Sequence, residues 1–278
     1  MGKTILRSWL ISFFIGGMIF TSLAQHEDIN QLDDNGKKNG VWVVKRKNGT
    51  LKYRGLFKNG HPSDKLYRYN EDGKLKCIMN YSLGGDTVDA IYYYPKGTKS
   101  ATGRYINRKK TGAWKMFLKD GNVSSVLNFK RNQLHGISKT YYDNGNMKSL
   151  SKWQDGKLSG TKFEYYKEGA LLSKSQYKDG IEFGIHRELY RDGKVRFEGS
   201  IENGMKQGAW RYYDVKGELG CELQYNDDKL LNPEELDKLS ELVIPTKEDT
   251  KNKYTDPKDF IYNPMEYIHR VNKMQKSY

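Results

Sequence analysis

Five histidines and two cysteines are the residues of this 278-residue chain that could hold a metal ion or act as a base or nucleophile. They are spread singly along the chain, at His26, His61, Cys77, His135, His186, Cys221 and His269. No H-E-x-x-H, C-x-x-C, phosphate-binding loop or G-x-S-x-G motif surrounds any of them. We therefore interpret each histidine as a surface or turn residue, and we expect no catalytic residue, no metal site and no cofactor.

Acidic residues are a second possible source of catalysis. Six aspartates lie mostly in or beside expected turns: Asp86, Asp89, Asp143, Asp155, Asp179 and Asp192. A turn aspartate accepts hydrogen bonds from its own backbone, so turn formation accounts for these residues. An enzyme whose site is not visible in the sequence is the least favoured hypothesis.

One stretch, residues 86–112, combines aromatic and basic side chains and could bind a ligand. Its candidate binding residues are Tyr92, Tyr94, Arg104, Arg108, Lys109 and Lys110. Aromatic rings beside cations can bind sugars, polyanions or nucleic acids. The alternative is that the tyrosines belong to a packed ladder and the cations to a solvated turn.

Glycines recur every 24 residues over most of the chain, and this period defines the elements that position these residues. One series, Gly112, Gly136, Gly160, Gly184 and Gly208, extends backwards to Gly40, Asp64 and Val88. Nine residues after each of these eight positions lies a glycine: Gly49, Gly73, Gly97, Gly121, Gly145, Gly169, Gly193 and Gly217. The series predicts eight repeats. Asn or Asp before most of these glycines predicts a hairpin turn that needs positive φ at glycine.

A second turn is expected eleven residues after the first. It falls at Gly60, Gly84, Gly156, Gly180 and Gly204, with Arg108, Asn132 and Asp228 in other repeats. Apolar and polar residues alternate between the turns, with Trp153 expected inside and Lys148 and Arg196 facing water. The sequence therefore predicts an all-β fold, an elongated antiparallel meander of eight 24-residue β-hairpin repeats.

The two cysteines occupy the same repeat position six repeats apart. At a strand spacing of ~4.8 Å this separates them by roughly 58 Å. A disulfide needs Cα atoms within about 7 Å, so we expect Cys77 and Cys221 not to pair with each other.

The two ends of such an array need segments that cover them. We expect an N-terminal half-repeat cap at residues 25–39 and the eight repeats at residues 40–231. Asn232-Pro233-Glu234-Glu235 has the residues of a helix start. Residues 232–278 are therefore expected to form a helical C-terminal tail, with a second helix starting near Asn263.

Residues 1–24 have the features of an export signal peptide. Lys3 and Arg7 precede an apolar run from Trp9 to Phe20, and Ser22-Leu23-Ala24 offers a cleavage site. The alternative is an uncleaved anchor, but the run is shorter than the ~20 residues that span a membrane. We therefore expect an exported protein, periplasmic, associated with the outer surface or secreted, with no transmembrane segment after signal removal.

The chain is strongly basic. Its formal net charge is +14, and loss of Lys3 and Arg7 with the signal leaves +12. A surplus of positive charge attracts acidic partners. We expect the partner to be another envelope or secreted protein, or an anionic surface of lipid or polysaccharide, and we expect no nucleic acid.

Three segments carry a family resemblance: "GVWVVKRKNG" (40–49), "GAWKMFLKDG" (112–121) and "GAWRYYDVKG" (208–217). With "DGKLSG" (155–160) and "NGMKQG" (203–208), they resemble the MORN-type repeats, in the bacterial variant that reads roughly G-x-W-x-x-Y-x-x-x-G. The resemblance covers residues 33 to about 230. It implies a hairpin meander used for protein or membrane contacts, and some relatives are labelled antitoxin components.

Three functions follow as hypotheses. The favoured one is a non-enzymatic exported scaffold that binds an envelope partner through a long, basic, tyrosine-rich sheet. An antitoxin-like inhibitor of a partner toxin is the main alternative, and a hidden enzyme is the third.

Overall fold

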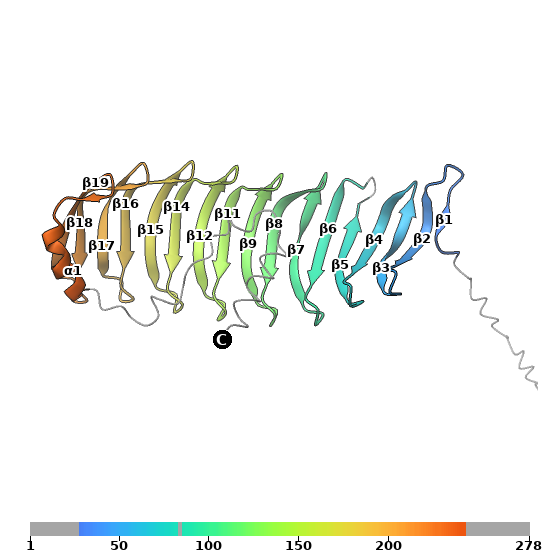
Figure 1. The fold of residues 1–278 in the computed structure, drawn as a ribbon, viewed down its shortest axis with the longest axis horizontal. Coiled ribbons are helices and arrows are strands. Elements are labelled where there is room, and N and C mark those ends of the chain that lie inside the picture. Colours follow the sequence, from blue (N-terminus) through green and yellow to red (C-terminus); the bar gives the residue numbers. More distant parts are fainter. Residues whose placement is uncertain (1–27, 83–84, 243–278) are drawn as a thin grey trace, which may run out of the picture.

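The computed structural model describes residues 28–82 and 85–242, which form one elongated antiparallel sheet of 20 strands (Figure 1). The strands of the first half are β1 (Gln31–Leu32), β2 (Lys38–Lys45), β3 (Leu51–Lys58), β4 (His61–Tyr69), β5 (Leu75–Tyr81), β6 (Thr87–Tyr93), β7 (Lys99–Ile106), β8 (Lys109–Phe117), β9 (Val123–Lys130) and β10 (Gln133–Leu134). Those of the second half are β11 (Gly136–Tyr141), β12 (Met147–Gln154), β13 (Lys157–Leu158), β14 (Gly160–Tyr165), β15 (Leu171–Lys178), β16 (Ile181–Leu189), β17 (Val195–Glu202), β18 (Met205–Tyr213), β19 (Leu219–Asn226) and β20 (Lys229–Leu230). A 3₁₀ turn, η1 (Pro233–Glu235), and helix α1 (Leu236–Leu242) follow.

The sheet is a meander in which strands pair with their neighbours along the chain, as in β2–β3, β3–β4 and β18–β19. Sixteen strands have six to nine residues and form the paired strands of the eight repeats. The two-residue strands β10 and β13 are the beginnings of longer strands that break one residue before Gly136 and Gly160. They continue beyond the break as β11 and β14. The predicted all-β meander is thus confirmed.

The first turn of each repeat is a three-residue loop closed by its glycine. All eight predicted glycines have φ between 80° and 101°. The Asn or Asp before the glycine, such as Asn144, has no positive φ, so the loop is a type I turn followed by a left-handed glycine rather than a two-residue type I′ turn. The Asn144 side chain accepts a hydrogen bond from the Asn146 N–H at 3.1 Å, which is why Asn or Asp recurs there.

The second turn is the two-residue type I′ hairpin, because both central residues have positive φ. Asp179 and Gly180 have φ of 53° and 85°, and Asn203 and Gly204 have 52° and 84°. Where glycine is replaced, the backbone keeps the same conformation, with φ of 63° at Arg108, 74° at Asn132 and 64° at Asp228. Gly84, also predicted for this turn, lies outside the described residues.

A β-bulge after each first turn changes which side chains share a face. Thr140 pairs with Ser149 and Tyr141 with Met147, so Lys148 is the extra residue. At the equivalent position Arg196 is half-buried and forms an ion pair with Glu188 at 2.8 Å. The prediction that Lys148 and Arg196 face water is therefore wrong for both, since Lys148 is also half-buried. Strict alternation begins only after the bulge.

One face of the sheet, here called the aromatic face, carries the core. Trp114 is fully buried and its indole lies over Gly103, while Trp210 lies over Gly199 in the same way. Two clusters result, one from Ala90 to Leu158 around Trp114 and one around Trp210 with Ile201 and Leu223. Trp153 lies in the first cluster, as predicted.

The two cysteines are buried and unpaired, as their repeat positions predict. Cys77 is 1% exposed and Cys221 is 4% exposed, and burial raises the pKa of both thiols. They fill core positions as small apolar side chains.

An asparagine side chain covers each end of the sheet. Asn30 accepts from the Val43 N–H at 2.8 Å and donates to the Val43 carbonyl at 3.1 Å. Asn232 accepts from the Gln224 N–H at 2.7 Å and donates to the Glu222 carbonyl at 2.9 Å. Asn232 was expected to cap a helix, but it makes no side-chain cap bond to η1 because its amide is bound to β19.

Helix α1 packs across the last strands β18 and β19 at the C-terminal end of the sheet (Figure 1). No helix among residues 28–82 and 85–242 is long and apolar enough to cross a membrane. The predicted export signal at 1–24 and the predicted second helix near Asn263 lie outside the described residues.

Candidate functional site

The six candidate binding residues of the third repeat are not gathered on one surface. Tyr92 lies on the aromatic face, where its hydroxyl bonds to that of Tyr105 at 3.0 Å, and burial raises its pKa. Tyr94 is 8% exposed and donates to the Phe117 carbonyl at 2.7 Å. Both tyrosines therefore have structural roles that the ladder alternative anticipates.

Two of the predicted cations are also engaged. Arg104 is exposed and holds Asp89 with two hydrogen bonds, at 2.7 and 3.0 Å. Lys110 is 5% exposed, with its ammonium 5.1 Å from the ring centroids of both Trp114 and Phe129. Burial lowers the pKa of Lys110 to about 8. Neither side chain is a free surface cation.

The two remaining residues, Arg108 and Lys109, lie on a basic edge of the sheet. This second-turn edge is formed by the type I′ turns between β7 and β16. Its six exposed cations are Arg108, Lys109, Lys130, Arg131, Lys157 and Lys178. None of the six has an ion-pair partner among the described residues within 4.0 Å. Asp155, which contacts His135 at 3.3 Å, and Asp179 are the acidic residues at these turn tips.

The opposite edge, formed by the first turns, is closer to electrical balance. Between β6 and β15 its turns carry four cations, Lys96, Lys99, Lys119 and Lys167, against Asp120, Asp143 and Glu168. Lys167 is paired with Asp143 at 2.8 Å, and Glu168 lies 3.4 Å from Arg191 of the next turn. Of the two edges, the second-turn edge therefore carries the larger surplus of positive charge in these repeats.

Tyrosines of the first turns join each repeat to the next. The hydroxyls of Tyr94, Tyr142, Tyr166 and Tyr190 each donate to the backbone carbonyl 23 residues ahead, at 2.7–2.8 Å. Arg46 makes the equivalent bond to the Tyr69 carbonyl at 2.6 Å. These residues recur at multiples of 24, but the periodicity alone did not identify their bonds.

Lysine and tryptophan are coupled on the aromatic face. Lys38, Lys110 and Lys206 each lie four residues before a tryptophan, with the ammonium 4.5–5.1 Å from its ring centroid. Cations and aromatic rings attract at this range. The equivalent positions two residues before and two residues after Gly184 hold Glu182 and His186, whose Oε1 and Nδ1 atoms lie 2.6 Å apart.

Among the described residues, His186 belongs to the cluster whose residue types, serine, histidine and carboxylate, are those of a catalytic triad. Its ring stacks on Phe197 at 5.8 Å, so the prediction of a surface or turn residue is wrong for this histidine. Ser175 Oγ lies 3.2 Å from His186 Nδ1, and Glu182 Oε1 lies 2.6 Å from the same nitrogen. The bonds to His186 and Tyr177 lower the pKa of Glu182 against the opposing effect of burial.

This cluster does not have the geometry of a catalytic triad. In a triad the hydroxyl and the carboxylate bond to different ring nitrogens, so that the histidine can pass a proton between them. Here both contact Nδ1, and Ser175 is 3% exposed. Residues 28–82 and 85–242 also contain no group of three His, Cys, Asp or Glu side chains placed to hold a metal.

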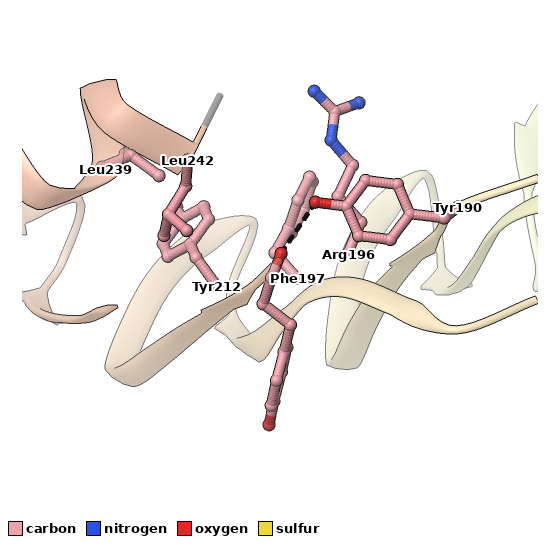
Figure 2. A pocket seen from close by; sticks show the side chains of 7 residues that line it. Tyr190, Arg196, Phe197, Tyr212, Leu239 and Leu242 are labelled. Carbon is pink, nitrogen blue, oxygen red and sulfur yellow. Dashed lines mark hydrogen bonds between the residues drawn. The ribbon is translucent and has the colours of Figure 1, made fainter. Parts of the chain in front are cut away.

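A small pocket lies under α1. Its volume is about 80 Å³, and it is lined by Tyr190, Arg196, Phe197, Tyr212, Tyr213, Leu239 and Leu242 (Figure 2). The Tyr190 hydroxyl donates to the Tyr213 carbonyl at 2.7 Å, and Figure 2 draws this bond as a dashed line from the Tyr190 ring. The pocket is mainly apolar, and its one cation, Arg196, is paired with Glu188.

Comparisons with solved structures find only distant likenesses. A chain of a TcdB2-TccC3-Cdc42 complex is 11% identical with a TM-score of 0.20, and the match covers 69% of this chain and 12% of that chain. A porin-like protein from Bacteroides uniformis is 8% identical with a TM-score of 0.17, over 68% of this chain and 91% of that one. At such scores neither likeness carries an argument. This chain spans about an eighth of the first structure's length.

The family comparison matches the repeats themselves. No curated protein matches the sequence significantly. The family model described as MORN repeat variant matches residues 134–157 and 158–179, two consecutive segments in the 24-residue register. The hairpins, turn glycines and tyrosine bonds of these segments recur in the repeats on either side. Residues 134–179 are thus two repeats of the MORN variant family, and the described repeats on either side share their hairpin geometry.

Proposed function

We propose that this protein is an exported, non-enzymatic scaffold that binds an anionic component of the cell envelope through its second-turn edge. The observation that carries the proposal is the row of six exposed cations on that edge without ion-pair partners. Exposed cations that have no internal partner are available to an external anion at little desolvation cost.

The repeat architecture supports a binding role. Each repeat adds one hairpin, and each second turn places its tip on the same edge of the sheet. Successive tips are therefore separated by two strand spacings, or ~10 Å. A repeated unit of this kind presents the same contact many times, which favours extended partners over small ones.

The chemistry of the aromatic face supports a non-catalytic role. Its titratable side chains are held by each other, as in Glu182 with His186 and Glu188 with Arg196. Ser175, the hydroxyl nearest to the histidine, is buried and shares a ring nitrogen with the carboxylate. This arrangement favours a structural role for the polar cluster of Ser175, Glu182 and His186.

Fractionation and sedimentation test the proposal together. The full-length chain is expressed with its leader, and cell fractions are probed for the mature protein. Purified mature protein is then sedimented with isolated envelopes at low and high salt. We expect the protein outside the cytoplasm and on the envelope, with binding lost on the order of tenfold or more as salt rises and screens exposed charges.

Two outcomes would overturn the proposal. Retention of the full-length protein in the cytoplasm would remove the envelope as its partner. Envelope binding that is insensitive to salt would indicate an apolar protein interface in place of the basic edge.

A further inference from the structure

Two neighbouring turns on the second-turn edge hold four cations side by side. Arg108 and Lys109 lie at the tip between β7 and β8, and Lys130 and Arg131 lie at the tip between β9 and β10. Both hairpins are consecutive in the sheet, so the two tips are ~10 Å apart. All four side chains are exposed, and no described acid pairs with them.

The two arginines occupy backbone positions that do not suit arginine. Seven second turns are fully described, and their central residues are Gly, Asn or Asp at every position except Arg108 and Arg131. The φ of Arg108 is 63° and that of Arg131 is 52°. A side chain with a Cβ is disfavoured in this region, by roughly 1 kcal/mol. Large residues held in such conformations cluster at functional sites.

The chemistry of arginine indicates what these positions bind. Guanidinium presents a planar fork of donors that matches the oxygens of a phosphoryl group in a bidentate way, which the ammonium of lysine cannot do. We propose that this edge binds a linear polyanion whose phosphoryl groups meet successive turns, with Arg108 and Arg131 as the residues that determine specificity. This inference rests on the proposed function and names the chemistry of its ligand.

A linear polymer suits this site better than a bilayer surface. The cations follow the single line of turn tips along the edge of a one-layer sheet, and the series continues with Lys157 and Lys178. A protein that enters the membrane interface inserts aromatic or large apolar side chains beside its cations. The tips of the two turns carry Asn107 and Asn132 beside the arginines, and the exposed apolar side chain next to them is the aliphatic Ile106, with no aromatic ring among the described residues of either tip.

Three variants of the mature protein separate local recognition from overall charge. The edge variant is Arg108→Asn, Lys109→Gln, Lys130→Gln and Arg131→Asn; asparagine suits positive φ, so the turns are expected to fold. The fork variant, Arg108→Lys with Arg131→Lys, keeps the charge. The control variant removes four exposed cations of the first-turn edge, Lys47→Gln, Lys96→Gln, Lys99→Gln and Lys119→Gln. Thermal unfolding by circular dichroism confirms that each variant is folded.

Binding is measured by calorimetry against inorganic polyphosphate, with poly-glutamate and phosphatidylglycerol vesicles as the other probes. We expect wild-type protein to prefer polyphosphate over poly-glutamate. We expect the edge variant to lose affinity by on the order of tenfold or more, and the fork variant by about threefold or more. The control variant is expected to change by less than about threefold because its charges are remote from the site.

Each contrary result has a distinct meaning. Equal losses in the edge and control variants, or equal binding of the two polymers, would overturn the proposed recognition. Binding to vesicles alone would replace the polymer with a lipid surface and would also overturn it. If wild-type protein sediments with envelopes but does not bind polyphosphate, this inference is refuted and the proposed function stands.

Discussion

Replacing Gly103 by alanine tests the packing that holds the aromatic face together. Gly103 lies under the indole of the fully buried Trp114, and an added Cβ would stand 2.6 Å from Trp114 Cγ and closer still to two other ring atoms. Ordinary contact begins at 3.4 Å, so the ring must move by roughly 1 Å against a densely packed cluster. The φ of Gly103 is not in the left-handed region, so the cost comes from packing and not from backbone strain.

We expect Gly103→Ala to destabilise the protein by about 1–3 kcal/mol, the usual range for overpacking. Trp114→Ala alone should cost about 3–5 kcal/mol. The double variant should cost less than the two single costs added, because the new methyl group then enters space that the indole has left. Thr102→Ala, on the opposite face beside Gly103, is the matched control and should stay within about 0.5 kcal/mol.

The assay is urea unfolding followed by tryptophan fluorescence, together with hydrogen exchange of the β7 and β8 amides. Exchange is needed because a repeat array can open locally before it unfolds as a whole. The reasoning is refuted if the Gly103→Ala variant unfolds at the same urea concentration as the wild-type protein. It is also refuted if the free-energy cost of the double variant equals the sum of the two single costs.

Three further predictions concern bonds between repeats, a buried cation and the sheet ends. Tyr190→Phe removes the bond to the Tyr213 carbonyl and should cost about 0.5–1.5 kcal/mol, seen as faster exchange in β17 and β18; unchanged exchange would contradict it. Because burial lowers the pKa of Lys110 from 10.5 to about 8, the unfolded chain binds more protons between these values and stability should rise with pH there. We expect a rise of roughly 2 kcal/mol relative to Lys110→Met, less than the shift alone implies since the rings of Trp114 and Phe129 favour the cation. Equal pH profiles would refute it. Asn232→Ala frees the edge of β19 and should cause concentration-dependent association in analytical ultracentrifugation, whereas a monomer at all concentrations would count against the capping role.

The regular part of the fold could be predicted because its cause is local. Each first turn needs a residue that tolerates positive φ, and glycine at Gly49 and its seven equivalents reveals that need in the sequence. The second turn is less visible, since Arg108, Asn132 and Asp228 hold the same backbone without glycine. The type of turn was not predictable from Asn-Gly pairs alone, because both a type I′ turn and a three-residue loop use them.

The side-chain contacts could not be predicted because they depend on register between strands. A bulge at Arg196, equivalent to the one at Lys148, shifts the alternation by one residue and places Arg196 beside Glu188 in place of solvent. The same cause hid His186, whose partners are Ser175 of the neighbouring strand β15 and Glu182 of its own strand β16. Arg108 and Lys109 were found as candidates because they share a stretch with Tyr92 and Tyr94, whereas Lys130 and Arg131 lie one repeat further on and needed the sheet to bring them close.

Sedimentation of the edge variant and the first-turn control variant with isolated envelopes tests the central claim most directly. Both variants have lost four positive charges, so they differ only in which edge has lost them. The basic edge predicts that the control remains largely bound at low salt while the edge variant stays in solution. Equal sedimentation of the two would show that overall charge, and not this row of turns, attaches the protein to its partner.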